Sequence, residues 1–267
     1  MQVESNASKI RQTIMYLLLI ACSALMVLPF LWMLSASVKL DKDVFSFPID
    51  WIPAHPRWAN YRDIWTTIPL GTFIRNTVKL TLIVTFLQLF TSSFAAYAFS
   101  KLHFRGRDTL FLGYVATIAM PWQVYMVPQF VMMSKMGLNN THLAIILLQA
   151  FSAFGVFMMK QFYTSIPTEL CEAARVDGMT EYGIYFKIML PLSKPALSTL
   201  KIFTFVNTWN DFLGPYIYLT REKLKTIAIG LRMFIGQYSQ EYGLIMAASV
   251  VDLPLPVCPM RPRNSPW

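Results

Sequence analysis

Apolar stretches long enough to cross a bilayer recur along this chain and constrain its fold more than any other feature. A helix needs about 20 apolar residues to span a hydrocarbon core about 30 Å thick. Because lipid cannot hydrogen-bond the backbone, such stretches must be helical. They occupy residues 14–33, 77–99, 109–133, 143–162 and 195–219, and a shorter one covers residues 244–251. We therefore predict an all-α, polytopic transmembrane helix bundle in which six spans are expected and the sixth is truncated.

The composition agrees with a protein that lives in lipid. The chain is 55% hydrophobic and 14% charged, whereas a soluble domain carries about 25% charged residues. Its net charge of +9 comes from basic residues scattered among the apolar stretches. This pattern favours an anionic lipid surface over nucleic acid as the partner. We expect a multi-pass protein of the cell membrane.

Catalytic and metal-binding patterns are missing from the sequence. The cysteines Cys22, Cys171 and Cys258 stand alone, and the three histidines are equally scattered. They predict no disulfide framework, metal site or catalytic group. The chain also lacks the glycine-rich G-x-x-x-x-G-K-[ST] loop that holds nucleotide phosphates. We expect neither an enzyme nor a bound cofactor, and ATP would have to bind to another chain.

The pattern of polar segments divides the chain into three regions. Residues 1–72 contain the first span and a loop rich in proline and tryptophan, which we expect at the membrane interface. Residues 73–251 form the core, with a polar segment at 165–194. Within the third apolar stretch, Pro121 and Pro128 each free a backbone carbonyl, which is consistent with a harmless kink or with a gate. Residues 252–267 form a proline-rich tail.

The polar segment 165–194 has an order that a simple connecting loop does not need. It contains Glu172-Ala173-Ala174, a glycine at Gly178 and a proline at Pro191. Glu172 places negative charge near the positive end of a helix, alanines allow close approach of a partner, and Gly178 suits a helix end. We expect a second short helix over residues 180–188, closed by Pro191. The acidic character favours docking to a protein over lying on lipid.

The spacing E-A-A-x3-G-x9-I-x-L-P matches residues 172–191 and resembles the cytoplasmic coupling loop of permease subunits in binding-protein-dependent ABC importers. The positions of Asp177, just before the glycine, and Pro195, four residues after Pro191, resemble those in the sugar-importer branch of the family. This branch includes the maltose-type and glycerol-3-phosphate-type second permeases. The resemblance implies a cytoplasmic loop that seats in the ATP-hydrolysing subunit. It also implies three partners: a second homologous permease, a dimer of ATP-binding subunits and an extracytoplasmic solute-binding protein. The coupling role carries over to Glu172, Ala173, Ala174, Gly178 and Pro191.

A second polar group lies within the fifth apolar stretch. It consists of Asn207, Trp209, Asn210 and Asp211. A carboxylate deep in a span costs about 2.5–3.5 kcal/mol on insertion scales, so it usually faces a cavity or a partner. Amides and an indole suit a sugar, and residues 207–212 resemble the corresponding span of sugar-importer permeases. Hydrogen bonding between helices is the alternative interpretation.

Two classes of transporter fit a polytopic helix bundle. An ion-coupled secondary transporter would require several ionisable residues inside the membrane and a repeat of broken helices. Only Asp211 is clearly placed for such a role. We therefore predict a permease subunit of an ATP-driven, binding-protein-dependent importer, with a sugar or a polyol phosphate as its solute.

The C-terminal residues depart from the resemblance. The apolar stretch 244–251 has eight residues, which give about 12 Å of helix at about 1.5 Å per residue. Five prolines follow within residues 252–267, and proline cannot continue a helix. A reading-frame change, a truncated gene or a natural variant would each give such a tail. We expect a broken sixth span, a tail that is disordered or held near the outer face, and weakened assembly with the companion permease.

Overall fold

The computed structural model describes residues 6–234 and 241–252, and within these residues the secondary structure is helical. The chain forms two compact units, residues 71–229 and residues 1–70 with 230–267. The all-α class expected from the sequence is confirmed.

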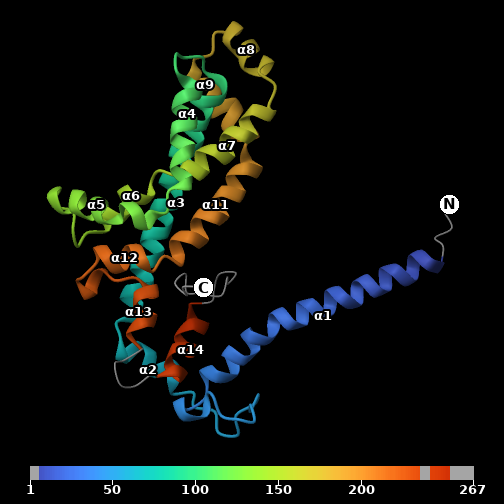
Figure 1. Cartoon of the computed structure of the whole chain (residues 1–267), viewed down its shortest axis with the longest axis vertical. Coiled ribbons are helices and arrows are strands. Elements are labelled where there is room, and N and C mark those ends of the chain that lie inside the picture. Colours follow the sequence, from blue (N-terminus) through green and yellow to red (C-terminus); the bar gives the residue numbers. More distant parts are fainter. Residues whose placement is uncertain (1–5, 235–240, 253–267) are drawn as a thin grey trace. The chain divides into compact units, whose positions relative to one another are not determined.

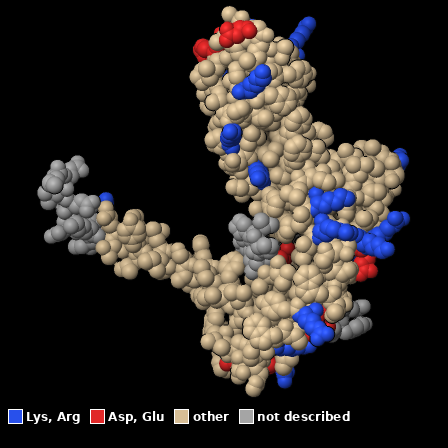
Figure 2. Space-filling view, turned by 180° about the vertical axis from the view of Figure 1, so that it is seen from behind, with Lys and Arg blue, Asp and Glu red and all other residues tan. Residues whose placement is uncertain are grey.

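Among its described residues, the first unit contains three complete α-helices and one short 3₁₀ helix. They are α1 (Asn6–Ser37), η1 (Asp41–Asp43), α2 (Asn60–Thr67) and α14 (Tyr242–Val251). From Arg11 onward α1 is long and apolar enough to cross a membrane, and its apolar part is unburied. Figure 2 shows its surface almost free of charged side chains. Such a surface suits contact with lipid or with another membrane chain.

A small network of hydrogen bonds joins α2 to the end of α1 and to the start of α14. Asn60 Nδ2 donates to the carbonyl oxygens of Ser37 and Lys39, both at 2.9 Å. The Gly243 amide donates to Asp41 Oδ1 at 2.8 Å. A Cβ at Gly243 would lie 2.8 Å from the Lys39 carbonyl oxygen, so a larger residue there would force these hydrogen-bonded groups apart. This contact fixes where α14 begins.

α14 is too short to be a span. Its 10 residues give about 15 Å of helix, which is about half of the hydrocarbon core. The residues expected to begin a sixth span therefore form a short apolar helix that ends at Val251. The tail, whose disorder or position near the outer face was predicted, lies after Asp252 and so outside the described residues.

The second unit holds the remaining helices in chain order. They are α3 (Leu70–Lys101, whose first residue belongs to the first unit), α4 (Arg107–Ala116), η2 (Thr117–Ala119), α5 (Trp122–Lys135), α6 (His142–Gln149), α7 (Ala153–Ser165), α8 (Glu169–Val176), α9 (Glu181–Ile184), the π-helix η3 (Tyr185–Met189), α10 (Leu190–Leu192), α11 (Lys194–Trp209), α12 (Leu213–Tyr218), η4 (Glu222–Leu224) and α13 (Ile227–Met233, which crosses the boundary between the units). Figure 1 shows α3, α4, α7 and α11 running alongside one another, with α8 at their end. Their main core packs α3, α7 and α11 against the segment 171–189.

Three of the expected spans are present as apolar helices of sufficient length among the described residues. They are Arg11–Ser37, Leu70–Lys101 and His142–Ser165, which correspond to the predicted first, second and fourth spans. The third is broken, because α4 with η2 and α5 meet at an angle of 103°. The break falls at Pro121, whose ring and missing amide stop the helix, whereas Pro128 lies within α5.

The fifth span expected over residues 195–219 is not one continuous helix. α11 ends at Trp209 after 16 residues, and α12 starts only at Leu213. The polar residues Asn210 and Asp211 occupy the break. Hydrophobicity alone does not reveal it, because the residues on either side are apolar.

Candidate functional site

The helix α8 carries the glutamate and the two alanines singled out in the sequence, and its end is closed by backbone geometry. Gly178 has φ +80°, a conformation that residues with a Cβ rarely adopt. The Gly178 amide donates to the Arg175 carbonyl at 3.0 Å, and the Met179 amide donates to the Ala174 carbonyl at 2.9 Å. These two bonds form a Schellman motif. Gly178 therefore ends α8 as predicted, and the chain turns there toward α9.

α8 has one buried face and one exposed face. Cys171 and Ala174 are buried in the core, and burial raises the pKa of the Cys171 thiol. Glu172 and Ala173 are exposed. Of the two alanines expected to allow close approach of a partner, only Ala173 is accessible. Ala174 packs the helix onto its own chain.

The exposed face of α8 combines apolar and acidic side chains. Val176 is 87% exposed and Leu170 is 46% exposed. Glu169, Glu172 and Asp177 are exposed beside them. Figure 2 shows acidic side chains gathered at the end of the unit that α8 occupies. Exposed apolar residues rimmed by charges are typical of an interaction surface.

The helix that follows Gly178 continues further than expected. The Thr180 hydroxyl accepts a hydrogen bond from the Gly183 amide at 3.2 Å and so starts α9. The chain then runs through the π-helix η3 into α10, which includes Pro191. The prediction that Pro191 closes this helix is wrong. In the π turn before it, the Leu190 amide donates to the Tyr185 carbonyl. Pro191 lies in the first turn of α10, a position where helices tolerate proline.

A charged network ties α8 to α9 and to α3. Arg175 Nε donates to Glu181 Oε1 at 2.6 Å, and the Tyr97 hydroxyl donates to Glu181 Oε2 at 2.5 Å. The guanidinium of Arg175 holds the pKa of the Glu181 carboxyl below its usual range, and the bond from Tyr97 acts in the same direction. Glu181 is therefore ionised at neutral pH. It occupies one of the unspecified positions of the motif, between Gly178 and Ile188, so the motif did not single it out.

One face of α3 contacts this whole segment through side chains four residues apart. Besides Tyr97, the Ser93 and Tyr185 hydroxyls are 2.7 Å apart. Lys101 Nζ donates to the Ile166 carbonyl at 2.5 Å. Residues spaced by four lie on one face of a helix. The sequence contains this signal, because Ser93 and Tyr97 lie in the apolar stretch 77–99 and Lys101 follows it at the same spacing.

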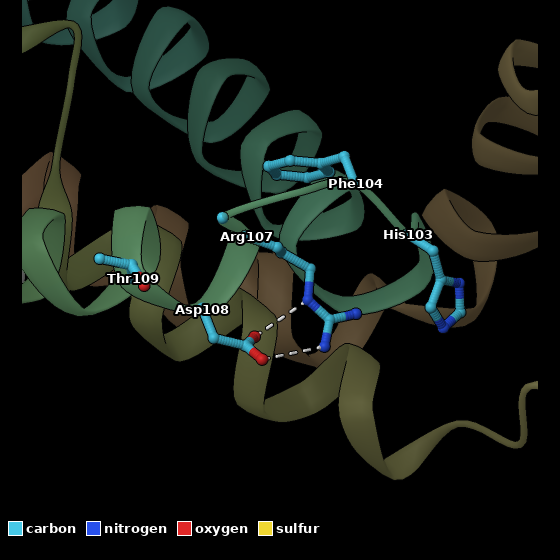
Figure 3. A pocket seen from close by; sticks show the side chains of 6 residues that line it. His103, Phe104, Arg107, Asp108 and Thr109 are labelled. Carbon is cyan, nitrogen blue, oxygen red and sulfur yellow. Dashed lines mark hydrogen bonds and ion pairs between the residues drawn. The ribbon is translucent and has the colours of Figure 1, made fainter.

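The turn between α3 and α4 encloses a shallow, open hollow. It is lined by His103, Phe104, Gly106, Arg107, Asp108 and Thr109. Figure 3 shows the Arg107 guanidinium turned onto the neighbouring Asp108 carboxylate, with Nε and Oδ1 2.9 Å apart. Arg107 also donates to the Leu102 carbonyl at 3.3 Å. Its charge therefore stabilises the turn.

The polar residues of the fifth span do not form one cluster. Asn207 is exposed, whereas Trp209 is buried and stacked on Phe205 with ring centroids 5.8 Å apart. Asn210 Nδ2 donates to the Val206 carbonyl of its own helix at 2.9 Å. Asp211 Oδ1 accepts from the Gly214 amide at 3.2 Å and so supports the start of α12. The structure thus separates the four candidates into different roles.

Asp211 also joins two broken helices. Its Oδ2 accepts a hydrogen bond from Gln149 Nε2 at 2.6 Å, and Gln149 is the last residue of α6. The break after α6 is covered by polar side chains: Thr91 Oγ1 donates to the Ala150 carbonyl at 2.6 Å, and Ser152 Oγ accepts from the Gly155 amide at 3.0 Å. Backbone interrupted at membrane depth requires such partners. The break lacks proline and glycine, so its residues carry no helix-breaking signal.

Comparison with known proteins identifies the family. Residues 88–255, more than half of the chain, match the family "Binding-protein-dependent transport system inner membrane component". The arabinooligosaccharides transport system permease protein AraQ of Halalkalibacterium halodurans is 35% identical over 85% of this chain and 82% of its own length. The sulfoquinovosyl glycerol transport system permease protein SmoH of Agrobacterium fabrum is 33% identical over 88% and 84%.

A solved structure agrees in fold. It is a bacterial ABC transporter involved in the import of the acidic polysaccharide alginate, with a TM-score of 0.82 and 22% identity, and the match covers 94% of each chain. The family gives no support to the alternative of an ion-coupled secondary transporter. Its members act with a second permease, an ATPase and a substrate-binding protein, and ATP is hydrolysed in the separate ATPase. The chain therefore belongs to the binding-protein-dependent transport system inner membrane components, as a multi-pass permease subunit of an ATP-driven importer.

Proposed function

We propose that this permease imports a carbohydrate or a polyol phosphate, and that α8 transmits the action of the ATPase to the membrane helices. The solute class is supported by the names of its relatives. Besides the two above, they include the lactose transport system permease protein LacG of Rhizobium radiobacter, which is 30% identical over 89% of this chain and 86% of its own length. The individual solute depends on the separate binding protein.

The exposed face of α8 is the observation that carries the coupling proposal. Leu170, Ala173 and Val176 supply an apolar surface, and Glu172 supplies a charge beside it. A partner with an apolar cleft and a basic rim fits this face. Gly178 acts through its backbone conformation and Pro191 acts within the helix that follows. Ala174 and Cys171 anchor the opposite face in the core.

The hydrogen-bonded connection of α8 to α3 supports the proposal that a displacement of α8 by the ATPase is transmitted to the membrane helices. Glu181 is held by both Arg175 and Tyr97, and Lys101 holds the chain just before α8. At the other end of the segment, the Tyr163 and Ser193 hydroxyls lie 3.3 Å apart and join α7 to the start of α11. A displacement of α8 would thus reach α3, α7 and α11 together.

The break in the fifth span is the proposed solute path. Asn207 offers an exposed amide, and the Asp211–Gln149 pair lies where two helices are interrupted. Trp209 and Asn210 support the path by packing and by bonding to their own helix. Amide and carboxylate groups suit sugar hydroxyls, and interrupted helices expose backbone groups only where a cavity or protein covers them.

Two adjacent alanines provide a matched test of the coupling face. In the assembled transporter, Ala173→Asp places a charge on the exposed face and should reduce ATPase binding and solute uptake while the permease still accumulates. Ala174→Asp places the same charge in the core, where an unpaired charge costs several kcal/mol, and should reduce the amount of folded permease. Normal uptake by Ala173→Asp in membrane vesicles would reject the docking role of this face.

The solute class is tested separately. The solute-binding protein that stimulates ATP hydrolysis by the reconstituted importer should be screened against sugars and polyol phosphates. Stimulation by one of these solutes supports the proposal, and stimulation only by amino acids, peptides or metal ions would reject it.

A further inference from the structure

The loop that follows α1 exposes a row of large apolar side chains. Phe47 is 94% exposed and Ile52 is 89% exposed, and Phe45, Ile49 and Trp51 are also exposed. Residues 44–54 carry one charged residue, Asp50. We call residues 45–52 the aromatic loop. Exposing so much apolar surface to water is unfavourable, so this loop requires an apolar environment.

The aromatic loop folds back along α1. The rings of Phe45 and Trp32 are 5.7 Å apart. The Asp50 carbonyl accepts hydrogen bonds from Ser35 Oγ, at 3.4 Å, and from Lys39 Nζ. The loop therefore lies beside the last two turns of α1, level with residues 32–35. Trp32 precedes the end of α1 at Ser37 by five residues, or about 7.5 Å along the helix axis at about 1.5 Å per residue.

This position determines what surrounds the loop. The apolar part of α1 crosses the membrane, so its last turns lie where hydrocarbon meets headgroups. We propose that the aromatic loop is inserted into the lipid interface on the side of the membrane where α1 ends, and that it anchors the end of this span. Phe47, Ile49, Trp51 and Ile52 contact lipid there.

The polar groups of the loop support lipid as the occupant. The Asp50 carbonyl is satisfied within the chain by Ser35 and Lys39, and Lys39 itself is buried. Tryptophan rings prefer this interface because one part of the ring is apolar and the N–H is polar. By Arg57 the chain has moved past the end of α1, because the Arg57 amide donates at 2.7 Å to the carbonyl of Val38. The apolar side chains are thus continuous with the lipid-facing surface of the span.

Spin labels can measure the depth of the loop in the assembled transporter in lipid nanodiscs. The native Cys22, Cys171 and Cys258 would be replaced by serine, and single cysteines would be introduced as Phe47→Cys or Ile52→Cys. His55→Cys is the control, because His55 is exposed in the same loop region but lies near the exit at Arg57. Collision rates are then measured with oxygen, which concentrates in lipid, and with a water-soluble nickel chelate.

Comparing the two reagents shows whether lipid or protein surrounds the aromatic loop. We expect labels at positions 47 and 52 to collide several-fold more with oxygen than with the chelate, and the ratio to reverse at position 55. Equal access of the chelate to all three positions would reject the proposal. Protection from both reagents would also reject it, because a protein covers a label from oxygen as well. Protection that appears only on adding the solute-binding protein would instead assign the loop to that partner.

Discussion

The hydroxyl of Tyr97 donates a 2.5 Å hydrogen bond to Glu181 Oε2, and this bond links the second membrane span to the segment that carries α8. Tyr97 is 3% exposed, and Arg175 completes the site from α8 itself at 2.6 Å. The same carboxylate thus contacts residues of both α8 and the span. Any movement of α8 against α3 must stretch or break one of these bonds.

Removing the Tyr97 hydroxyl should weaken coupling without abolishing docking. A hydrogen bond to a charged group contributes about 1.5–3 kcal/mol, and Tyr97→Phe removes only the donor. We expect the ATPase to remain bound while less solute is transported for each ATP hydrolysed. Tyr182→Phe is the control, because Tyr182 is 67% exposed. An unchanged ratio of transport to hydrolysis in Tyr97→Phe would remove this bond from the transmission path.

The Arg175–Glu181 pair predicts a pH dependence. In the folded chain, Arg175 lowers the pKa of Glu181 below its ordinary value of 4.5. The ionised carboxyl therefore contributes its full stabilisation when the pH is above that ordinary value. The stabilisation is lost as the pH falls through the lower, folded-state pKa. Between pH values of about 6 and 8 it should stay constant, since glutamate remains ionised.

Hydrogen exchange of residues 169–184 measures this dependence when wild type is compared with Glu181→Gln at each pH. At about pH 7 the variant should exchange faster, and the difference should shrink as Glu181 becomes protonated at low pH. Comparing the two proteins at the same pH cancels the intrinsic change in exchange rate. A difference that stays constant down to about pH 3 would mean that the ion pair does not stabilise the segment.

Gly178 should resist substitution for a conformational reason alone. A Cβ at this position would meet open space, so any loss reflects the φ of +80°. Gly178→Ala should cost about 1–2 kcal/mol, the penalty of the left-handed conformation, and Gly178→Asn should cost less. Limited proteolysis between α8 and α9 measures the loosening. Equal protease resistance in the alanine variant and the wild type would contradict the need for this conformation.

The sequence predicted the features that depend on local chemistry. The apolar runs gave the helices that became α1, α3 and the α6–α7 span, and Gly178 ended α8 because only glycine adopts its φ freely. The breaks at residues 150–152 and 210–212 were missed. They depend on partners from distant parts of the chain, Thr91 for Ala150 and Gln149 for Asp211. The burial of Ala174 depended in the same way on the core around α8, which a motif does not reveal.

The bond between Asp211 and Gln149 should behave as a coupled pair. Both Asp211→Leu and Gln149→Leu remove the 2.6 Å bond that joins α6 to the break in the fifth span. Asp211→Leu also removes the acceptor for the Gly214 amide, so it should reduce uptake more strongly. ATPase association should persist in both variants, because α8 and its contacts with α3 remain.

The double variant decides whether the two residues act together. Residues that share one interaction are non-additive by about 0.5–3 kcal/mol, so the double variant should transport no worse than Asp211→Leu alone. Asp211→Asn keeps an oxygen acceptor and should lie between wild type and Asp211→Leu. Additive losses in the double variant would mean that Gln149 and Asp211 contribute independently. Wild-type uptake in all three leucine variants would exclude the proposed solute path at this break, because these variants remove the hydrogen bond that joins the two interrupted helices.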